Sequence, residues 1–295
     1  MPASSPTHPM AANTTTGIGW WQGVRLAMTA LTVAAALAAC GTGPAGIAVV
    51  ANTQQTLSPG PNRILMAVSS EKDGSLVPLP DTPTTATFSK DGESDIEVPT
   101  RWIWGIPDAR GFLVANVDLP SAGRWNVVLR PDGMSATRST PFAVQDSSPV
   151  PSIGDRAIAA RTPTYPDTPL ASLSSDPNPD PRLYAMSLDD ALGDGIPTVI
   201  TFATPAYCTS ALCGPTLDVV RAVMPEFPDL DFVHVEVYDL AAAAGGSLEA
   251  VPAVEAWNLP SEPWVFVVDA GGIVTARFEG ALGADELRSA LSDLP

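Results

Sequence analysis

The sequence predicts two folded parts of different class, an all-β domain followed by an α/β domain. Short apolar runs separated by turn residues fill residues 62–145, whereas from residue 184 onward apolar runs alternate with amphipathic stretches. A proline-rich segment, residues 146–183, separates the two patterns. At 295 residues the chain is long enough for two domains that each bury a core.

The chain is strongly acidic, with 32 Asp and Glu against 15 Lys and Arg and a net charge of −17. Such a charge repels phosphate backbones, so nucleic acid is not an expected partner. Histidine occurs only twice, at His8 and His234, which argues against a metal site built from several imidazoles. We therefore expect no cofactor.

Residues 1–39 are predicted to be an export signal. They contain no Asp or Glu, and Arg25 precedes an apolar run, Leu26–Ala39. A run of about fourteen residues is too short to span a bilayer but is typical of a signal peptide. It ends in Leu-Ala-Ala-Cys-Gly at residues 37–41, which resembles the lipobox of bacterial lipoproteins. That resemblance implies that Cys40 is lipidated and becomes the new N-terminus.

An ordinary secretory signal, cleaved at a nearby Ala-x-Ala with Cys40 incidental, is the alternative. Both alternatives export the chain, and the lipoprotein alternative anchors it outside the cytoplasm on the cell membrane. Residues 40–61, rich in Gly, Pro, Ala, Ser and Thr, are then expected to be a flexible tether. Export also places Cys208 and Cys213 where disulfides form and persist.

Residues 62–145 are predicted to form a β-sandwich of immunoglobulin type, because short strands alternate with turns and no helical period appears. The expected strands include Ile64–Val68, Thr84–Phe88, Phe112–Val117 and Arg124–Leu129. The run Ala-Gly-Arg-Trp-Asn-Val-Val-Leu at 122–129 resembles late strands of small extracytoplasmic sandwiches. No catalytic residue stands out here, so an accessory or docking role is expected.

Residues 146–183 are predicted to be a semi-extended linker, because proline recurs along them. Part of the segment, residues 151–164, resembles the lead-in of peroxiredoxin-like and thioredoxin-like chains. That resemblance implies that the segment can pack on the second domain.

Residues 184–295 alternate between helix and strand. Ser187 is expected to cap the first short helix. The expected elements are helix 188–192, strand 197–203, helix 213–224, strand 231–238, helix 253–257, strand 264–268, strand 273–278 and helix 284–294.

This order, β-α-β-α-β-β-α after the first helix, resembles the thioredoxin fold, and the run Phe202–Cys208 resembles the approach to that family's active site. In the family the first cysteine lies at the turn between strand and helix, where the helix N-terminus favours the thiolate. The resemblance implies that Cys208 is the nucleophile and Cys213 the resolving cysteine. It also places Pro263 at the position of the family's cis-proline, which faces the pair.

The cysteine spacing departs from the family, since four residues rather than two separate Cys208 from Cys213. If the whole stretch were helical, the two Cα atoms would lie at least ~7.5 Å apart along the axis, beyond comfortable disulfide range. The loop must therefore continue past Cys208, with the helix beginning near Cys213, where Pro215 is tolerated in the first turn. The spacing leaves two interpretations open, an active redox pair and a static disulfide.

His234 and Glu236 are expected on one face of a central strand. The functional hypothesis makes Glu236 a buried proton acceptor for Cys213. The alternative, which we favour, is a satisfied, partly buried pair. Trp257 and Trp264 are expected in the core.

The leading hypothesis is a membrane-anchored extracytoplasmic thiol–disulfide oxidoreductase, whose partner is a protein thiol or disulfide substrate or a membrane redox protein. The main rival is a non-catalytic, surface-displayed binding lipoprotein with a structural disulfide.

Two further hypotheses rest on looser resemblances. Copper delivery, as in the Sco class, would need a closer cysteine spacing and a histidine placed later than His234. Peroxidase chemistry, as in peroxiredoxins, would need Thr three residues and Pro seven residues before the cysteine, where this chain has Pro205 and Thr201.

Overall fold

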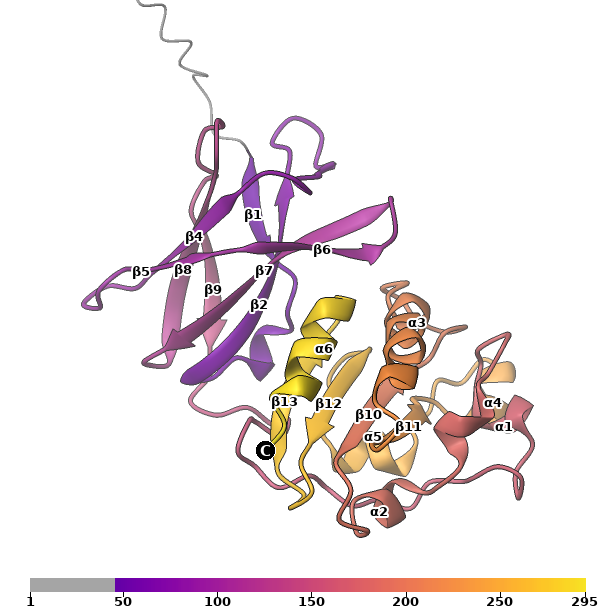
Figure 1. Cartoon of the computed structure of the whole chain (residues 1–295). Coiled ribbons are helices and arrows are strands. Elements are labelled where there is room, and N and C mark those ends of the chain that lie inside the picture. Colours follow the sequence, from indigo (N-terminus) through magenta and orange to yellow (C-terminus); the bar gives the residue numbers. More distant parts are fainter. Residues whose placement is uncertain (1–45) are drawn as a thin grey trace, which may run out of the picture. The chain divides into compact units, whose positions relative to one another are not determined.

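The computed structural model describes residues 46–295, and the expected signal segment and Cys40 lie outside the described residues. Residues 46–295 belong to one compact unit (Figure 1). Among the described residues, no helix is long and apolar enough to cross a membrane.

Nine strands form two antiparallel sheets in the first half of the described chain, and we call them together the sandwich. The first sheet has the order β1 (Ile47–Val50), β2 (Gly60–Ser69), β7 (Arg110–Leu119), β6 (Arg101–Ile106), and β3 (Leu76–Val77) also pairs with β2. The second has the order β5 (Ile96–Pro99), β4 (Thr84–Ser89), β8 (Gly123–Pro131), β9 (Thr140–Val144).

The two sheets pack face to face over a shared apolar core. Successive side chains of a strand point to opposite faces, so Ile64, Met66 and Val68 of β2 point into this core, where Phe88 and Trp125 of the second sheet meet them. Leu65 and Ala67 point the other way and are also buried. Burial on both faces explains why this strand is a continuous apolar run. The β-sandwich is confirmed, and its assignment to the immunoglobulin type stays a prediction.

The expected tether is ordered over much of its length. Residues 47–50 form β1, which pairs with β2, and residues 54–56 form the short 3₁₀ helix η1. Ala48 and Leu57 are buried in the sandwich core. The prediction of a flexible tether is therefore wrong for residues 47–61. These two apolar side chains are buried in the core, and residues 47–50 pair with β2 as an additional strand of the sheet.

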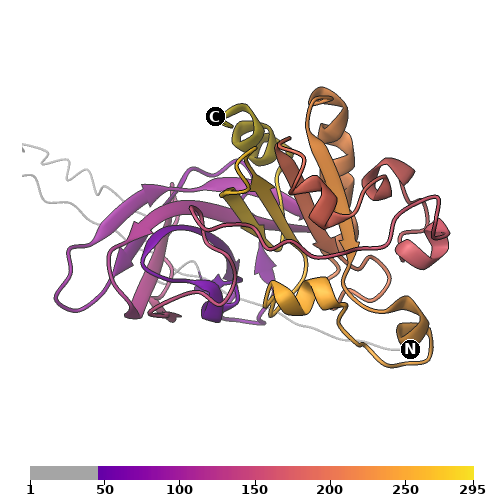
Figure 2. The ribbon, with the colours of Figure 1, turned by 90° about the horizontal axis from the view of Figure 1, so that it is seen from below.

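The proline-rich segment lies along the second module, residues 184–295 (Figure 2). Val150 and Leu173 are buried in that module's cores, and the backbone of Gly154 and Ala157 bonds to the β13 strand and the turn before it. The segment contains helix α1 (Leu170–Leu173) and the 3₁₀ helix η2 (Pro181–Tyr184). It packs on the second module, as the resemblance implied.

The second module contains one four-stranded sheet, of order β11 (Asp231–Glu236), β10 (Thr198–Ala203), β12 (Trp264–Val268), β13 (Val274–Glu279). Strands β10 and β11 run parallel, and the other pairs are antiparallel. The helices are α2 (Leu188–Ala191), α3 (Cys213–Val223), η3 (Met224–Glu226), α4 (Leu240–Ala244), α5 (Pro252–Ala256) and α6 (Ala284–Ser292). This is a thioredoxin-like arrangement, in which every predicted element occurs in the predicted order and helix α4, which was not predicted, lies between β11 and α5.

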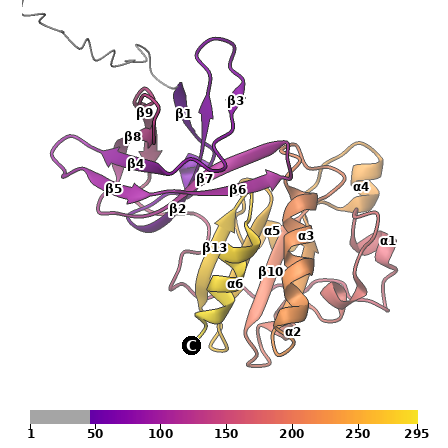
Figure 3. The ribbon, with the colours of Figure 1, turned by 45° about the horizontal axis from the view of Figure 1, so that its top comes forward.

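Helices cover both faces of this sheet. Helices α3 and α6 pack on the face that carries Val199, Val265 and Val267 (Figure 3). Helix α5 packs on the opposite face with Trp257, which is fully buried, as is Trp264 on β12. Both tryptophans therefore belong to the core, as predicted.

Ser187 stands at the N-cap of α2, as expected, but its hydroxyl does not cap the helix. The hydroxyl oxygen instead accepts a hydrogen bond from the backbone N–H of Thr162, at 2.8 Å. The residue therefore ties the proline-rich segment to the second module.

Candidate redox site

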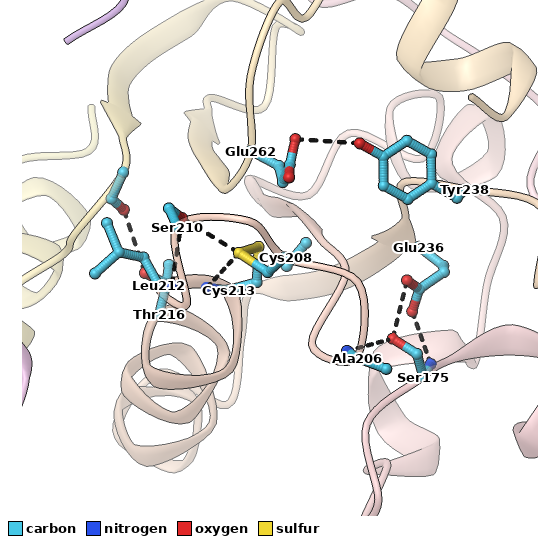
Figure 4. The surroundings of a disulfide bond; sticks show 12 residues. Ser175, Ala206, Cys208, Ser210, Leu212, Cys213, Thr216, Glu236, Tyr238 and Glu262 are labelled. Atoms are coloured by element: carbon cyan, nitrogen blue, oxygen red, sulfur yellow. Dashed lines mark hydrogen bonds between the residues drawn. A yellow bond between two sulfur atoms is a disulfide. The ribbon is translucent and has the colours of Figure 1, made fainter. Parts of the chain in front are cut away.

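Cys208 and Cys213 form a disulfide between the end of β10 and the start of α3 (Figure 4). Their Cα atoms lie 6.0 Å apart. Helix α3 begins at Cys213, so the chain continues as a loop past Cys208, as the spacing argument predicted. We call residues 204–212 the redox loop.

Two turns fold the redox loop back on itself. The N–H of Ala211 donates to the carbonyl of Cys208 at 3.3 Å, and the N–H of Leu212 donates to the hydroxyl of Ser210 at 3.3 Å. Ala211 has φ +59°, in the left-handed region that costs an alanine roughly 1–2 kcal/mol. This residue reverses the chain direction and lets a six-residue stretch close a disulfide.

The two cysteines differ in accessibility. Cys208 is partly exposed, whereas Cys213 is completely buried in the first turn of α3. Of the two residues, only Cys208 offers exposed surface to an attacking thiolate. This asymmetry fits the predicted roles of nucleophile for Cys208 and resolving cysteine for Cys213.

Hydrogen-bond donors surround the sulfur of Cys208. The backbone N–H of Cys213 donates to it at 3.2 Å, and the hydroxyl of Ser210 lies 3.3 Å away. The positive end of the α3 dipole is at the same place. In the reduced state these groups would favour a thiolate at Cys208, which is the reactive form.

Glu262 lies beside the redox loop, and the sequence reasoning missed it. The peptide bond from Glu262 to Pro263 is cis, as the family position of Pro263 implied. Burial raises the pKa of Glu262. Two hydrogen bonds that its carboxylate accepts, from the Thr209 N–H and from the Tyr238 hydroxyl at 3.5 Å, partly oppose this rise. Figure 4 shows Glu262 and Tyr238 pointing toward each other. The role of Pro263 stays a prediction.

Glu236 lies on the other side of the loop, and its bonds go to Ser175. Its carboxylate accepts from the Ser175 N–H at 2.7 Å and hydroxyl at 3.1 Å, and that hydroxyl accepts from the Ala206 N–H at 3.1 Å. Burial raises the pKa of Glu236. No hydrogen bond among the described residues links Glu236 to Cys213. Its observed contacts position the start of the redox loop, and proton acceptance for Cys213 stays a prediction.

His234 is fully buried, and both ring nitrogens are used. Nε2 lies 3.0 Å from the Ala203 carbonyl, so it carries the proton, and Nδ1 accepts from the Tyr184 hydroxyl at 2.6 Å. Burial lowers the pKa of His234 to about 4, so the ring is neutral at pH 7. The favoured interpretation was a satisfied, partly buried pair; the hydrogen bonds of His234 go to Tyr184 and Ala203 and those of Glu236 to Ser175, so each side chain is satisfied by other partners. Within residues 46–295, no cluster of three or more His, Cys, Asp or Glu could hold a metal.

A cavity of about 550 Å³ lies between β2 and β7 of the sandwich and β13 and α6 of the second module. Its walls include Arg63, Phe278 and Glu279, and neither cysteine lines it. This cavity is therefore separate from the disulfide.

Comparison with protein-family models and with curated proteins found no match. Among solved structures, a protein from Chlorobium tepidum described as the thiol:disulfide interchange protein DsbE is 14% identical, with a TM-score of 0.35 over 48% of this chain and 96% of that one.

Two proteins described as superoxide reductases also match. One, a neelaredoxin from Ignicoccus hospitalis, is 10% identical over 34% of this chain and 80% of its own, and one from Thermotoga maritima is 14% identical over 34% and 86%. Both have a TM-score of 0.22. Such distant likenesses assign no activity to this chain.

Proposed function

We propose that this protein is a membrane-anchored, extracytoplasmic thiol–disulfide oxidoreductase that works through the Cys208–Cys213 pair. The observation that carries the proposal is the asymmetric disulfide, in which a partly exposed Cys208 is bonded to a buried Cys213 at the N-terminus of α3. An exchange catalyst needs one sulfur that a partner can reach and a second that resolves the mixed disulfide.

The exchange starts when a substrate thiol loses its proton to solvent and the thiolate attacks the sulfur of Cys208. A bond forms between the two sulfurs, the Cys208–Cys213 bond breaks, and the electron pair leaves on Cys213, which then takes up a proton. A second substrate thiolate attacks the mixed disulfide and releases Cys208 as a thiolate. The substrate is oxidised by two electrons and the pair is reduced. The reverse sequence reduces a substrate disulfide.

Single substitutions of the two cysteines test this mechanism. Cys208→Ser should abolish exchange with a disulfide-bonded protein substrate such as insulin. Cys213→Ser should keep one round of attack and accumulate a mixed disulfide that mass spectrometry detects. Exchange by Cys208→Ser at the wild-type rate would contradict the proposal.

The anchor is proposed from the sequence pattern around Cys40. Strand β1 begins at Ile47, so a lipid on Cys40 would hold the sandwich within about 25 Å of the membrane, the greatest span of seven extended residues. Such a short connection favours a partner at the membrane surface. Labelled palmitate should enter the wild-type chain and not Cys40→Ala, and an unlabelled wild-type chain would remove the anchor from the proposal.

A second candidate function is a binding lipoprotein in which the disulfide is static. The observation that favours it is the firm packing of the redox loop, since Leu212 is buried and Ser210 is hydrogen-bonded to Arg110 of the sandwich. A static disulfide would resist reduction until the protein unfolds.

A further inference from the structure

The sandwich touches the redox loop through a charged side chain. Arg110, the first residue of β7, donates from Nη1 to the carbonyl of Ser210 at 2.8 Å. Ser210 lies between the two cysteines, and its hydroxyl is 3.3 Å from the sulfur of Cys208. A residue of the sandwich is therefore hydrogen-bonded to the short segment that the disulfide closes.

The sandwich also holds the loop through an apolar socket. Leu212, the residue before Cys213, is buried in a cluster built from the outward face of the first sheet and Ala281. The socket residues of the sandwich are Leu65, Ala67, Ile103, Phe112 and Val114.

Side chains pack closely around Gly105 of β6 at this socket, because a Cβ there would lie 2.6 Å from the Phe112 ring, 2.9 Å from the Ala281 Cβ and 3.0 Å from the Leu212 side chain. Strand β6 and helix α3 are in contact here (Figure 3).

A buried ion pair fixes the same sheet to the second module. Arg63 of β2 bonds to both carboxylate oxygens of Glu286 at 2.9 Å and to the carbonyl of Ala281 at 2.7 Å. Only 9% of the Arg63 side chain and 3% of the Glu286 side chain are exposed. Breaking such a pair leaves a buried charge uncompensated, so the contact is a permanent part of the fold.

We propose that the sandwich is a working part of the redox site, in which Arg110 and the socket around Leu212 hold the redox loop in its closed geometry and so shift the thiol–disulfide equilibrium toward the disulfide. The four-residue spacing between the cysteines then has a purpose, since its extra residues carry the contacts to the sandwich. Arg110 and the socket residues are positioning residues.

The physical basis is the entropy of closing the loop. The disulfide forms only when the two sulfurs meet, and a loop that is already ordered in the dithiol state loses less conformational freedom on closure. Contacts that order the loop in both states therefore favour the disulfide. The charge of Arg110 acts in the opposite sense, because a cation near Cys208 stabilises the thiolate of the reduced state.

The test is the equilibrium of the chain from Gly41 onward with graded glutathione and dithiothreitol buffers, counting alkylated thiols by mass. Arg110→Ala and Gly105→Ala should each lower the equilibrium constant for disulfide formation by about threefold to tenfold, the usual worth of one hydrogen bond or of a disturbed contact. Arg110→Lys, which loses the planar donor but keeps the charge that favours the thiolate, should lower the constant at least as far as Arg110→Ala does. Arg124→Ala, on the second sheet, is the matched control and should leave the constant unchanged.

The proposal would be overturned if Arg110→Ala and Gly105→Ala had the same equilibrium constant for disulfide formation as the wild type. A larger constant in Arg110→Ala would overturn it too. If Gly105→Ala fails to fold, as judged by circular dichroism, the two Arg110 variants alone test the proposal. This inference extends the proposed exchange function, and the two can fail separately. The equilibrium constant of the wild type tests the proposed exchange function. The ratio of the variant's constant to that of the wild type tests the proposed role of the sandwich. If every variant is reduced only on unfolding, both fail.

Discussion

Buried polar groups in this molecule fall into two regions with different construction. Away from the cysteines, Arg63–Glu286 and His234 are sealed from solvent and each charged or polar atom has a partner. Around the redox loop, Glu262 and Arg110 are only partly buried, and their side chains form hydrogen bonds with backbone groups of the loop. The sealed groups should govern the free energy of unfolding, and the half-exposed groups should govern the redox equilibrium.

The largest expected effect is the loss of Arg63. Burial alone would raise the pKa of Glu286, but Arg63, together with the Gly283 N–H and Arg101, outweighs burial and holds that pKa below its usual range, so the carboxylate stays charged. Arg63→Ala leaves that charge buried with only the half-exposed Arg101 nearby. We expect a loss of about 3 kcal/mol or more in the free energy of unfolding, measured by denaturant titration.

Arg288→Ala is the matched control for Arg63→Ala, because Arg288 pairs with Glu226 and Asp285 on the surface. Exposed pairs contribute about 1 kcal/mol or less. Equal losses in the two variants would show that the interface between the modules is no more sealed than the surface.

A somewhat smaller effect is expected from His234 on acidification. Its pKa is about 4 in the folded chain and about 6.5 when unfolded, so between these values the unfolded chain binds the proton and the folded chain does not. The stability due to the neutral ring is present above pH 6.5 and is lost as the pH falls toward 4. The loss should be about 2 kcal/mol at pH 5.

The measurement is the difference in pH dependence between wild type and His234→Gln. Asp231, whose pKa burial and Asp194 raise to about 6, changes stability in the opposite sense and is present in both proteins. The difference therefore isolates His234. Parallel pH profiles between pH 7 and 5 would mean that the ring is not sealed.

The smallest effect is expected at Glu262, on reactivity rather than on stability. A carboxylate beside the loop disfavours a second negative charge, so in the reduced protein Glu262→Gln should make the thiolate form of Cys208 more favourable. Alkylation of Cys208 in the reduced protein at pH 7 should become roughly two- to threefold faster. Glu255→Gln, on the exposed side of α5, is the control. Unchanged alkylation would place Glu262 outside the redox site.

The sequence predicts well what depends on local pattern. The elements of the second module follow from apolar runs such as Trp264–Val268, and the start of α3 follows from the reach of a disulfide. The unequal burial of Cys208 and Cys213 fits the roles expected from the thioredoxin resemblance.

Contacts between segments far apart in the chain could not be predicted. Strand β1 lies in a segment whose Gly and Ala content suggested a tether, and its pairing with β2 depends on a neighbour in space. Ser175, which bonds to Glu236, belongs to the segment predicted as a linker. Arg110 gave no local signal, because its contact with Ser210 joins residues 100 positions apart.

The proposed exchange function is tested by a redox titration of the chain from Gly41 onward, which contains Cys208 and Cys213 as its only cysteines. Thiols are counted by mass after alkylation across buffers of known potential. We expect a midpoint between about −120 and −270 mV, with the protein folded throughout, which would place the pair among exchange catalysts. A midpoint below about −300 mV, or reduction only on unfolding, would contradict it and identify the disulfide as structural.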